Sequence, residues 1–168
     1  DKNIAEATRL GGRVFDAAPP PRAVFGLELA HWFLYLGDRV NASRVLAQTL
    51  AEAGGALEQP VYEALRERCL LLPVTERSEF AEKFTARLQR ERAPIHACLA
   101  AGLLSALCGQ EKAAQNEFSR LLELRALRPS FAESLGDAGY RNWSFIVATG
   151  VQLQAWKLDA LAEWFWQK

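Results

Sequence analysis

The chain has 168 residues, of which 50% are hydrophobic and 24% are charged, and its 20 basic and 20 acidic side chains cancel. This length and composition can bury the core of one ordinary domain, and they exclude disordered, collagen-like and low-complexity proteins. Without a net charge, no global field draws the chain to nucleic acid or to an anionic membrane surface.

Apolar residues recur at three- and four-residue spacing along nearly the whole chain, which predicts an all-α fold. We expect residues 1–21 to form a short helix, interrupted by Gly11 and Gly12, and then a proline-rich break. Prolines near positions 21, 60 and 94 mark three further helix starts, because amide protons in the first helical turn have no partner to lose. Ser130 and Glu133 have the spacing of a capping box, which predicts a short extra helix over 130–136.

Tight turns are expected between the helices of each pair. The first three are about 36 residues apart, and a fixed period of this size is typical of helical repeats. The fourth follows the third by about 48 residues, and the short extra helix accounts for the excess. The first three turns lie at Gly37, around Pro73 and at Gly109, and a fourth lies near Lys157. The expected helix pairs cover about 22–53, 60–92, 94–127 and 142–167.

The residues around these turns resemble the tetratricopeptide repeat. That family has a small residue seven positions before the turn glycine, a small residue five positions after it and a large one nine positions after it. The matching residues are Ala30, Ala42 and Leu46 around Gly37; Gly102, Ala114 and Phe118 around Gly109; and Gly150, Ala162 and Trp166 around Lys157. Lys157 replaces the usual glycine, and the pair around Pro73 fits the pattern worst. Other helical-hairpin arrays, such as HEAT-like repeats, have a similar periodicity.

The resemblance implies that residues 22–168 form antiparallel helix pairs stacked as a short, right-handed tetratricopeptide-like solenoid. The first helix of each pair then lines a concave groove for a partner protein. The groove positions are His31, Leu34, Tyr35, Glu63, Glu67, Leu70, His96, Leu99 and Leu103. This set is unusually apolar for a groove and offers Glu and Leu where a peptide C-terminus would need Lys, Arg or Asn, which favours an amphipathic helix or an apolar segment as the occupant. The alternative is that the chain's own insertion fills the groove.

Sequence motifs for catalysis, metal binding or cofactor binding are missing. His31 and His96 have no second ligand at helical spacing, and no nucleophile elbow or phosphate-binding loop occurs. Cys69, Cys98 and Cys108 have no CxxC spacing and fit core positions in a reducing compartment. We therefore expect no enzyme activity, no cofactor and no metal.

Aromatic residues gather at the C-terminus, where four of the five tryptophans lie within the last 26 residues. Trp164 and Trp166 are separated by about 200° around a helix, so one core face cannot hide both. Phe165 lies between them, and we expect one of the three aromatic residues to be exposed, either as an interface to another protomer or domain, or as the bare end of a helical array.

These observations favour a non-catalytic scaffold or adaptor for protein–protein interaction. The alternative is a regulatory or spacer domain that packs on an adjacent enzyme or membrane domain of the same chain. The absence of methionine, even at position 1, favours a segment of a longer protein. The compartment stays open: the cytoplasm is slightly favoured, and the alternative is a soluble domain of a membrane-anchored protein. No stretch approaches the roughly 20 uncharged residues of a membrane-spanning helix. Nucleic-acid binding ranks last, since acidic residues interleave with the arginines.

Overall fold

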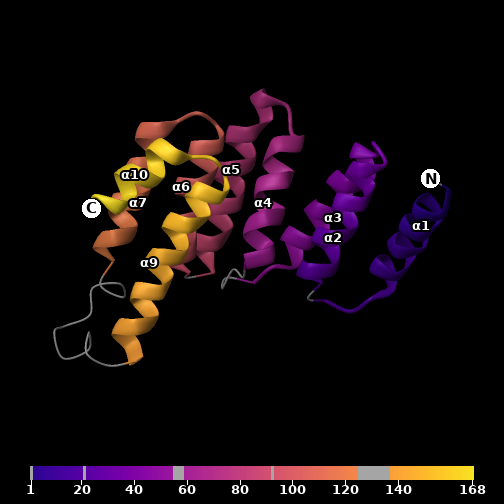
Figure 1. Cartoon of the computed structure of the whole chain (residues 1–168), viewed down its shortest axis with the longest axis horizontal. Coiled ribbons are helices and arrows are strands. Elements are labelled where there is room, and N and C mark those ends of the chain that lie inside the picture. Colours follow the sequence, from indigo (N-terminus) through magenta and orange to yellow (C-terminus); the bar gives the residue numbers. More distant parts are fainter. Residues whose placement is uncertain (1, 21, 55–58, 92, 125–136) are drawn as a thin grey trace. The chain divides into compact units, whose positions relative to one another are not determined.

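The computed structural model describes residues 2–20, 22–54, 59–91, 93–124 and 137–168, with backbone alone for 137–145. Within these ranges every regular element is a helix, which confirms the predicted all-α fold (Figure 1). The helices are α1 (Lys2–Ala17), α2 (Ala23–Tyr35), α3 (Arg39–Glu52), α4 (Gln59–Leu71), α5 (Val74–Arg90), α6 (Pro94–Leu107), α7 (Glu111–Glu123), α9 (Asp137–Ala155) and α10 (Asp159–Trp166). The extra helix predicted over 130–136 lies outside the described residues.

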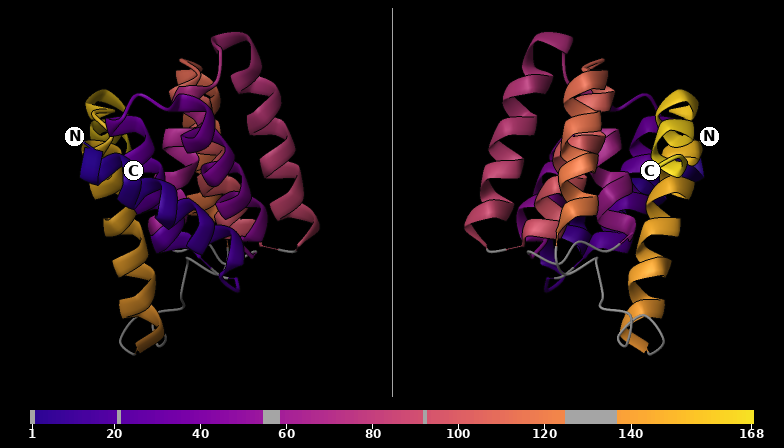
Figure 2. Two further views of the ribbon diagram at one scale, coloured as in Figure 1. Left: turned by 90° about the vertical axis from the view of Figure 1, so that its right-hand side faces the viewer. Right: turned by 90° about the vertical axis from the view of Figure 1, so that its left-hand side faces the viewer.

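The chain divides into two compact units, Asp1–Arg77 and Ser78–Lys168. In the first unit, α2 pairs with α3, α1 packs on α2, and α4 packs on both α2 and α3. In the second unit, α6 pairs with α7 and α9 with α10, and α10 also contacts α7. Figures 1 and 2 show α6 and α7 side by side. The last pair begins at Asp137, five residues before the predicted start at 142.

Helix α1 runs unbroken through Gly11 and Gly12, so the predicted interruption is wrong. A Cβ atom at Gly11 would lie 3.1 Å from Cδ1 of Leu29, and one at Gly12 would lie 3.6 Å from Cζ of Phe33. The two glycines therefore form the face of α1 that packs against α2. Close packing between the helices offsets the cost of two glycines inside a helix, which is about 1 kcal/mol each.

The turns after α2, α6 and α9 share one geometry, in which the second residue past the helix has a left-handed backbone. The φ angles are 77° at Gly37, 74° at Gly109 and 60° at Lys157. In each turn the next amide donates to a carbonyl five residues earlier, as in a Schellman motif. These bonds join Asp38 to Phe33 (2.8 Å), Gln110 to Ser105 (2.9 Å) and Leu158 to Leu153 (3.0 Å). Three of the four predicted turns therefore have this geometry, including the one without glycine, and the fourth separates α4, which ends at Leu71, from α5, which begins at Val74.

Lys157→Gly is expected to stabilise the chain by about 1 kcal/mol, because Lys157 holds a left-handed backbone that crowds its Cβ atom. Urea unfolding followed by circular dichroism measures the change. Gly109→Lys is the matched control, and it should lower the free energy of unfolding by a similar amount. A Lys157→Gly chain that unfolds at the same or a lower urea concentration would contradict this account of the turn.

A partly buried ion pair ties the α1–α2 connection to the end of α3. Nε of Arg22 donates to Oε2 of Glu52 over 3.0 Å, and Nη1 of Arg22 donates to the carbonyl oxygen of Phe15. The guanidinium also lies 4.3 Å from the centre of the Phe15 ring. The hydrogen bond from Arg22 lowers the pKa of Glu52 below its usual 4.5.

Low pH is expected to lower the stability of the folded chain, partly because it protonates Glu52. Because its pKa is lower in the folded chain, its stabilising effect is complete above about pH 4.5 and is lost as the pH falls through the folded pKa. Glu52→Gln should therefore lower stability at pH 7 and make it depend less on pH below 4.5. Thermal unfolding between pH 7 and pH 3 measures this, and an unchanged acid dependence would contradict the role of Glu52.

Candidate partner-binding surfaces

The predicted groove residues of the first unit are accessible to solvent to different degrees. His31 and Tyr35 are exposed on α2, whereas Leu34 and Glu67 are half-buried. Nη1 of Arg66 lies 2.6 Å from Oε1 of Glu67, so this carboxylate already has a cationic neighbour. Leu70 on α4 is 36% exposed, so the most accessible of the predicted residues in this unit are His31, Tyr35 and Leu70.

The predicted groove residues of the second unit are mostly in the core. Leu99 is 5% exposed and Leu103 is 0% exposed, so the expectation that they face a partner is wrong in this structure. Helix α6 buries residues on most of its circumference, so periodicity could not show which side faces solvent. His96 is half-buried, and desolvation lowers its pKa, which keeps the imidazole neutral at pH 7.

An exposed aromatic pair on α2 is the most prominent feature of the first unit. Trp32 is 48% exposed and Tyr35 is 70% exposed. Their ring centres lie 6.2 Å apart at 81°, an edge-to-face arrangement that aromatic rings favour. The spacing of three residues places both rings on one side of the helix. Trp and Tyr in such positions are typical anchors of protein interfaces.

Next to this pair lies an apolar groove between α1 and α2, with a volume of about 280 Å³. Its apolar lining consists of Ile4, Ala7, Gly11, Phe25, Leu29 and Trp32, and its polar lining of Thr8 and Glu28. The Thr8 hydroxyl donates to the carbonyl oxygen of Ile4 over 2.8 Å. Glu28 is therefore the one acidic side chain of the described residues that line this groove.

Further exposed apolar side chains continue the groove along both helices. Val14 is 57% exposed and follows Gly11 by three residues on α1, and Val24 is 62% exposed and precedes Glu28 by four on α2. Residues three or four apart share a helix face. We use the name α1/α2 surface for the lining residues together with Val14, Val24 and Tyr35.

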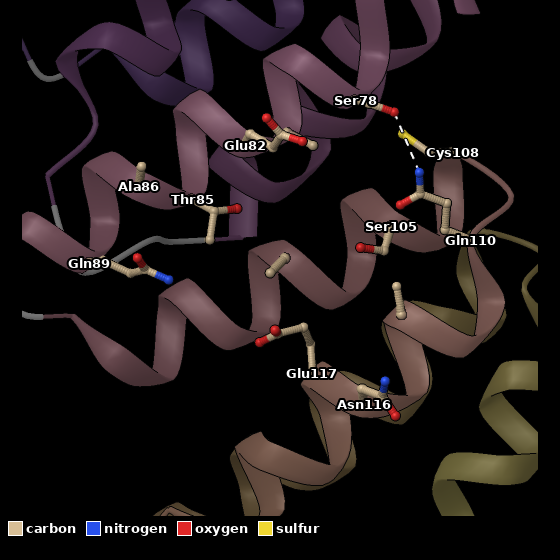
Figure 3. Close-up of a pocket in the computed structure, with 13 residues that line it drawn as sticks. Ser78, Glu82, Thr85, Ala86, Gln89, Ser105, Cys108, Gln110, Asn116 and Glu117 are labelled. Carbon is tan, nitrogen blue, oxygen red and sulfur yellow. Dashed lines mark hydrogen bonds between the residues drawn. The ribbon is translucent and has the colours of Figure 1, made fainter.

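A second groove, of different chemistry, lies in the second unit between α5 and α7, over α6 (Figure 3). It has a volume of about 390 Å³. Its small side chains include Ala81, Ala101 and Ala113, and its uncharged polar side chains are Ser78, Thr85, Gln89, Ser105, Gln110 and Asn116. Glu82 lies on α5 and Glu117 on α7, on opposite sides. We call this the α5/α7 groove.

The C-terminal aromatic residues differ in exposure, as predicted. Phe165 is 3% exposed and its ring centre lies 5.7 Å from that of Phe118, which joins α10 to α7. Trp166 is 44% exposed. Its ring packs against Gly150, where a Cβ atom would overlap it. Trp164 is half-buried, with Nζ of Lys168 5.6 Å from its ring centre. An interface through Trp164 and Trp166 stays a prediction.

The remaining sites of chemical interest are few. Cys69 and Cys98 are buried, as predicted, and burial raises the pKa of Cys98. Cys108 is half-buried at the edge of the α5/α7 groove. Within the described part of the chain, no three His, Cys, Asp or Glu side chains gather as metal ligands would. Among the same residues, no helix combines the length and the apolar character that crossing a membrane requires.

A scan against protein-family models gave no match for this chain, and searches of curated proteins and of solved structures gave none either.

Proposed function

We propose that this chain is a non-catalytic scaffold that binds a partner protein through the α1/α2 surface. The exposed pair of Trp32 and Tyr35 carries the proposal. Large aromatic side chains expose apolar area to water, and contact with a partner removes that area at about 25 cal/mol per Å². Burying the remaining exposed part of each ring stabilises a complex by on the order of 2 kcal/mol.

The occupant that fits this surface best is an amphipathic helix. The groove is long and apolar and follows two neighbouring helices, and a helix with apolar residues every three or four positions can insert them along it. Glu28 is the acidic side chain in the lining. A partner helix with Lys or Arg facing Glu28 would pair with that carboxylate and fix the direction of binding.

A tetratricopeptide-like arrangement of the helix pairs belongs to the same proposal. Its support is the recurrence of one turn geometry at Gly37, Gly109 and Lys157. Further support comes from the small residues seven positions before two of these turns, since Gly102 packs on Phe118 and Gly150 on Trp166 at the repeat offsets. In that arrangement the first helix of each pair, such as α2, lines the concave surface and presents its solvent-facing side to a partner.

Photo-crosslinking tests the proposal and identifies the partner segment. A benzophenone amino acid is placed at Tyr35, on the proposed surface, or at Val40, which is 80% exposed on α3. We expect one defined protein to be crosslinked from position 35 and not from position 40, through a segment with helical apolar periodicity. Equal crosslinking from both positions, or none from position 35, would rule out this surface as the docking site.

A further inference from the structure

The α5/α7 groove differs from the α1/α2 surface in what it can hold. Small alanine side chains from α5, α6 and α7 leave the space open, and no large aliphatic or aromatic side chain is among the described residues that line it. An apolar helix would therefore gain little here, because there is no large apolar area to cover. The groove needs an occupant that hydrogen-bonds.

The uncharged polar side chains of the groove suit a polypeptide backbone. Gln89 on α5 and Asn116 on α7 each carry an amide that can donate and accept, and Thr85 and Ser105 add hydroxyls (Figure 3). Backbone groups are available to such partners only in an extended segment, because a helix satisfies its own. Nε2 of Gln110 lies 3.5 Å from Oγ of Ser78 and closes one end of the groove.

The groove carries negative charge, which favours an occupant with basic side chains. Glu82 and Glu117 line opposite sides, and no Lys, Arg or His is among the lining residues that the structure describes. Glu117 has a cation beside it, Arg120, which is outside the lining and whose Nη1 lies 3.9 Å from Oε2 of Glu117 in a solvent-accessible pair. Such an exposed pair contributes little energy. The two carboxylates would also repel the phosphate groups of a nucleic acid.

We infer that the α5/α7 groove binds an extended segment of a partner protein that carries Lys or Arg side chains, one for each carboxylate. The backbone of the segment bonds to the amides and hydroxyls, and its cations lie between Glu82 and Glu117. This site lies in the second unit and goes beyond the proposed function of the α1/α2 surface. A partner that bears both an amphipathic helix and a basic extended segment would be held at two points.

Selection from a phage-displayed library of random 12-residue peptides tests the inference. The bait is the full chain with Trp32→Ala and Tyr35→Ala, so that failure of the α1/α2 proposal cannot affect the result. We expect the recovered peptides to be enriched in Lys and Arg. In fluorescence anisotropy titrations, Glu82→Gln together with Glu117→Gln should weaken their binding about tenfold or more, which is 1.4 kcal/mol or more.

Charge-matched controls separate the groove from general electrostatic attraction. Glu123→Gln together with Glu163→Gln removes two exposed carboxylates outside the groove, and binding should stay within about twofold. The single variant Glu82→Gln keeps the test valid if Glu117→Gln unfolds the chain, because Glu82 is exposed. Recovered peptides without basic residues, peptides that bind both charge variants equally, or no recovered peptide at all would overturn the inference.

Discussion

Phe118→Ala is expected to lower the free energy of unfolding by about 3–5 kcal/mol, the largest loss that we predict for one substitution. The ring is 0% exposed, packs against Gly102 and meets Phe165 edge-on. It therefore joins α6, α7 and α10, and its removal leaves a cavity among all three helices. Urea unfolding followed by circular dichroism measures the loss, and a value below about 1 kcal/mol would contradict this packing.

The fit between Gly102 and Phe118 gives a sharper version of the same test. A Cβ atom at Gly102 would lie 2.8 Å from two carbons of the Phe118 ring. Gly102→Ala should therefore cost about 1–3 kcal/mol through overpacking, despite the gain of about 1 kcal/mol that alanine brings to a helix.

Adding Phe118→Leu to Gly102→Ala should recover part of this loss. The double variant recreates the combination of Ala30 and Leu46, which occupies the same offsets around the first turn and is fully buried there. Phe118→Leu should then lower the free energy of unfolding less in the Gly102→Ala background than beside the native glycine. If the two effects simply add, the small and large residues of the pair are not coupled, and the repeated packing is refuted.

Trp32→Ala and Tyr35→Ala are each expected to weaken binding of the crosslinked partner segment by about 2 kcal/mol, roughly 30-fold. Both rings are half-exposed or more, so little of the fold depends on them. Isothermal titration calorimetry with the synthetic segment measures the affinity. Thermal unfolding of each variant should change by less than about 1 kcal/mol.

Val40→Ala is the control for the loss of an exposed apolar side chain, because Val40 is 80% exposed on a different helix of the same unit. It should leave the affinity unchanged. Two aromatic variants that bind as tightly as the native chain would show that the partner uses another surface. A similar loss with Val40→Ala would show that the effect is not specific to the pair.

Three of the four predicted helix pairs, α2–α3, α6–α7 and α9–α10, are packed in the structure, and these pairs and their turns could be predicted because they depend on local rules. Gly37 and Gly109 adopt the left-handed backbone that a glycine tolerates best, and on the amphipathic helices apolar spacing indicates which face is buried. Even the turn at Lys157, which has no glycine, can be located from its sequence offsets to Gly150 and Trp166. The offsets between small and large residues thus carry more information than the turn residue alone.

The candidate site was harder to predict because exposure depends on neighbouring helices. Trp32 was not among the predicted groove residues, although its spacing of three from Tyr35 is a signal that could have found it. Gly11 and Gly12 suggested a break, and only the packing of α1 on α2 shows that they form a contact face. Leu99 and Leu103 lie on a helix that is apolar on most sides, where periodicity does not distinguish core from groove.

The amide spectrum of the ¹⁵N-labelled chain, recorded while the partner segment is added, tests the central claim most directly. If the α1/α2 surface receives an amphipathic helix, the largest shifts should fall within residues 4–14 and 24–35, together with the indole proton of Trp32. Residues 39–52 should change little, because α3 contributes no side chain to this surface. Shifts centred on α3 or on the second unit, with the Trp32 indole unmoved, would contradict the proposed docking site.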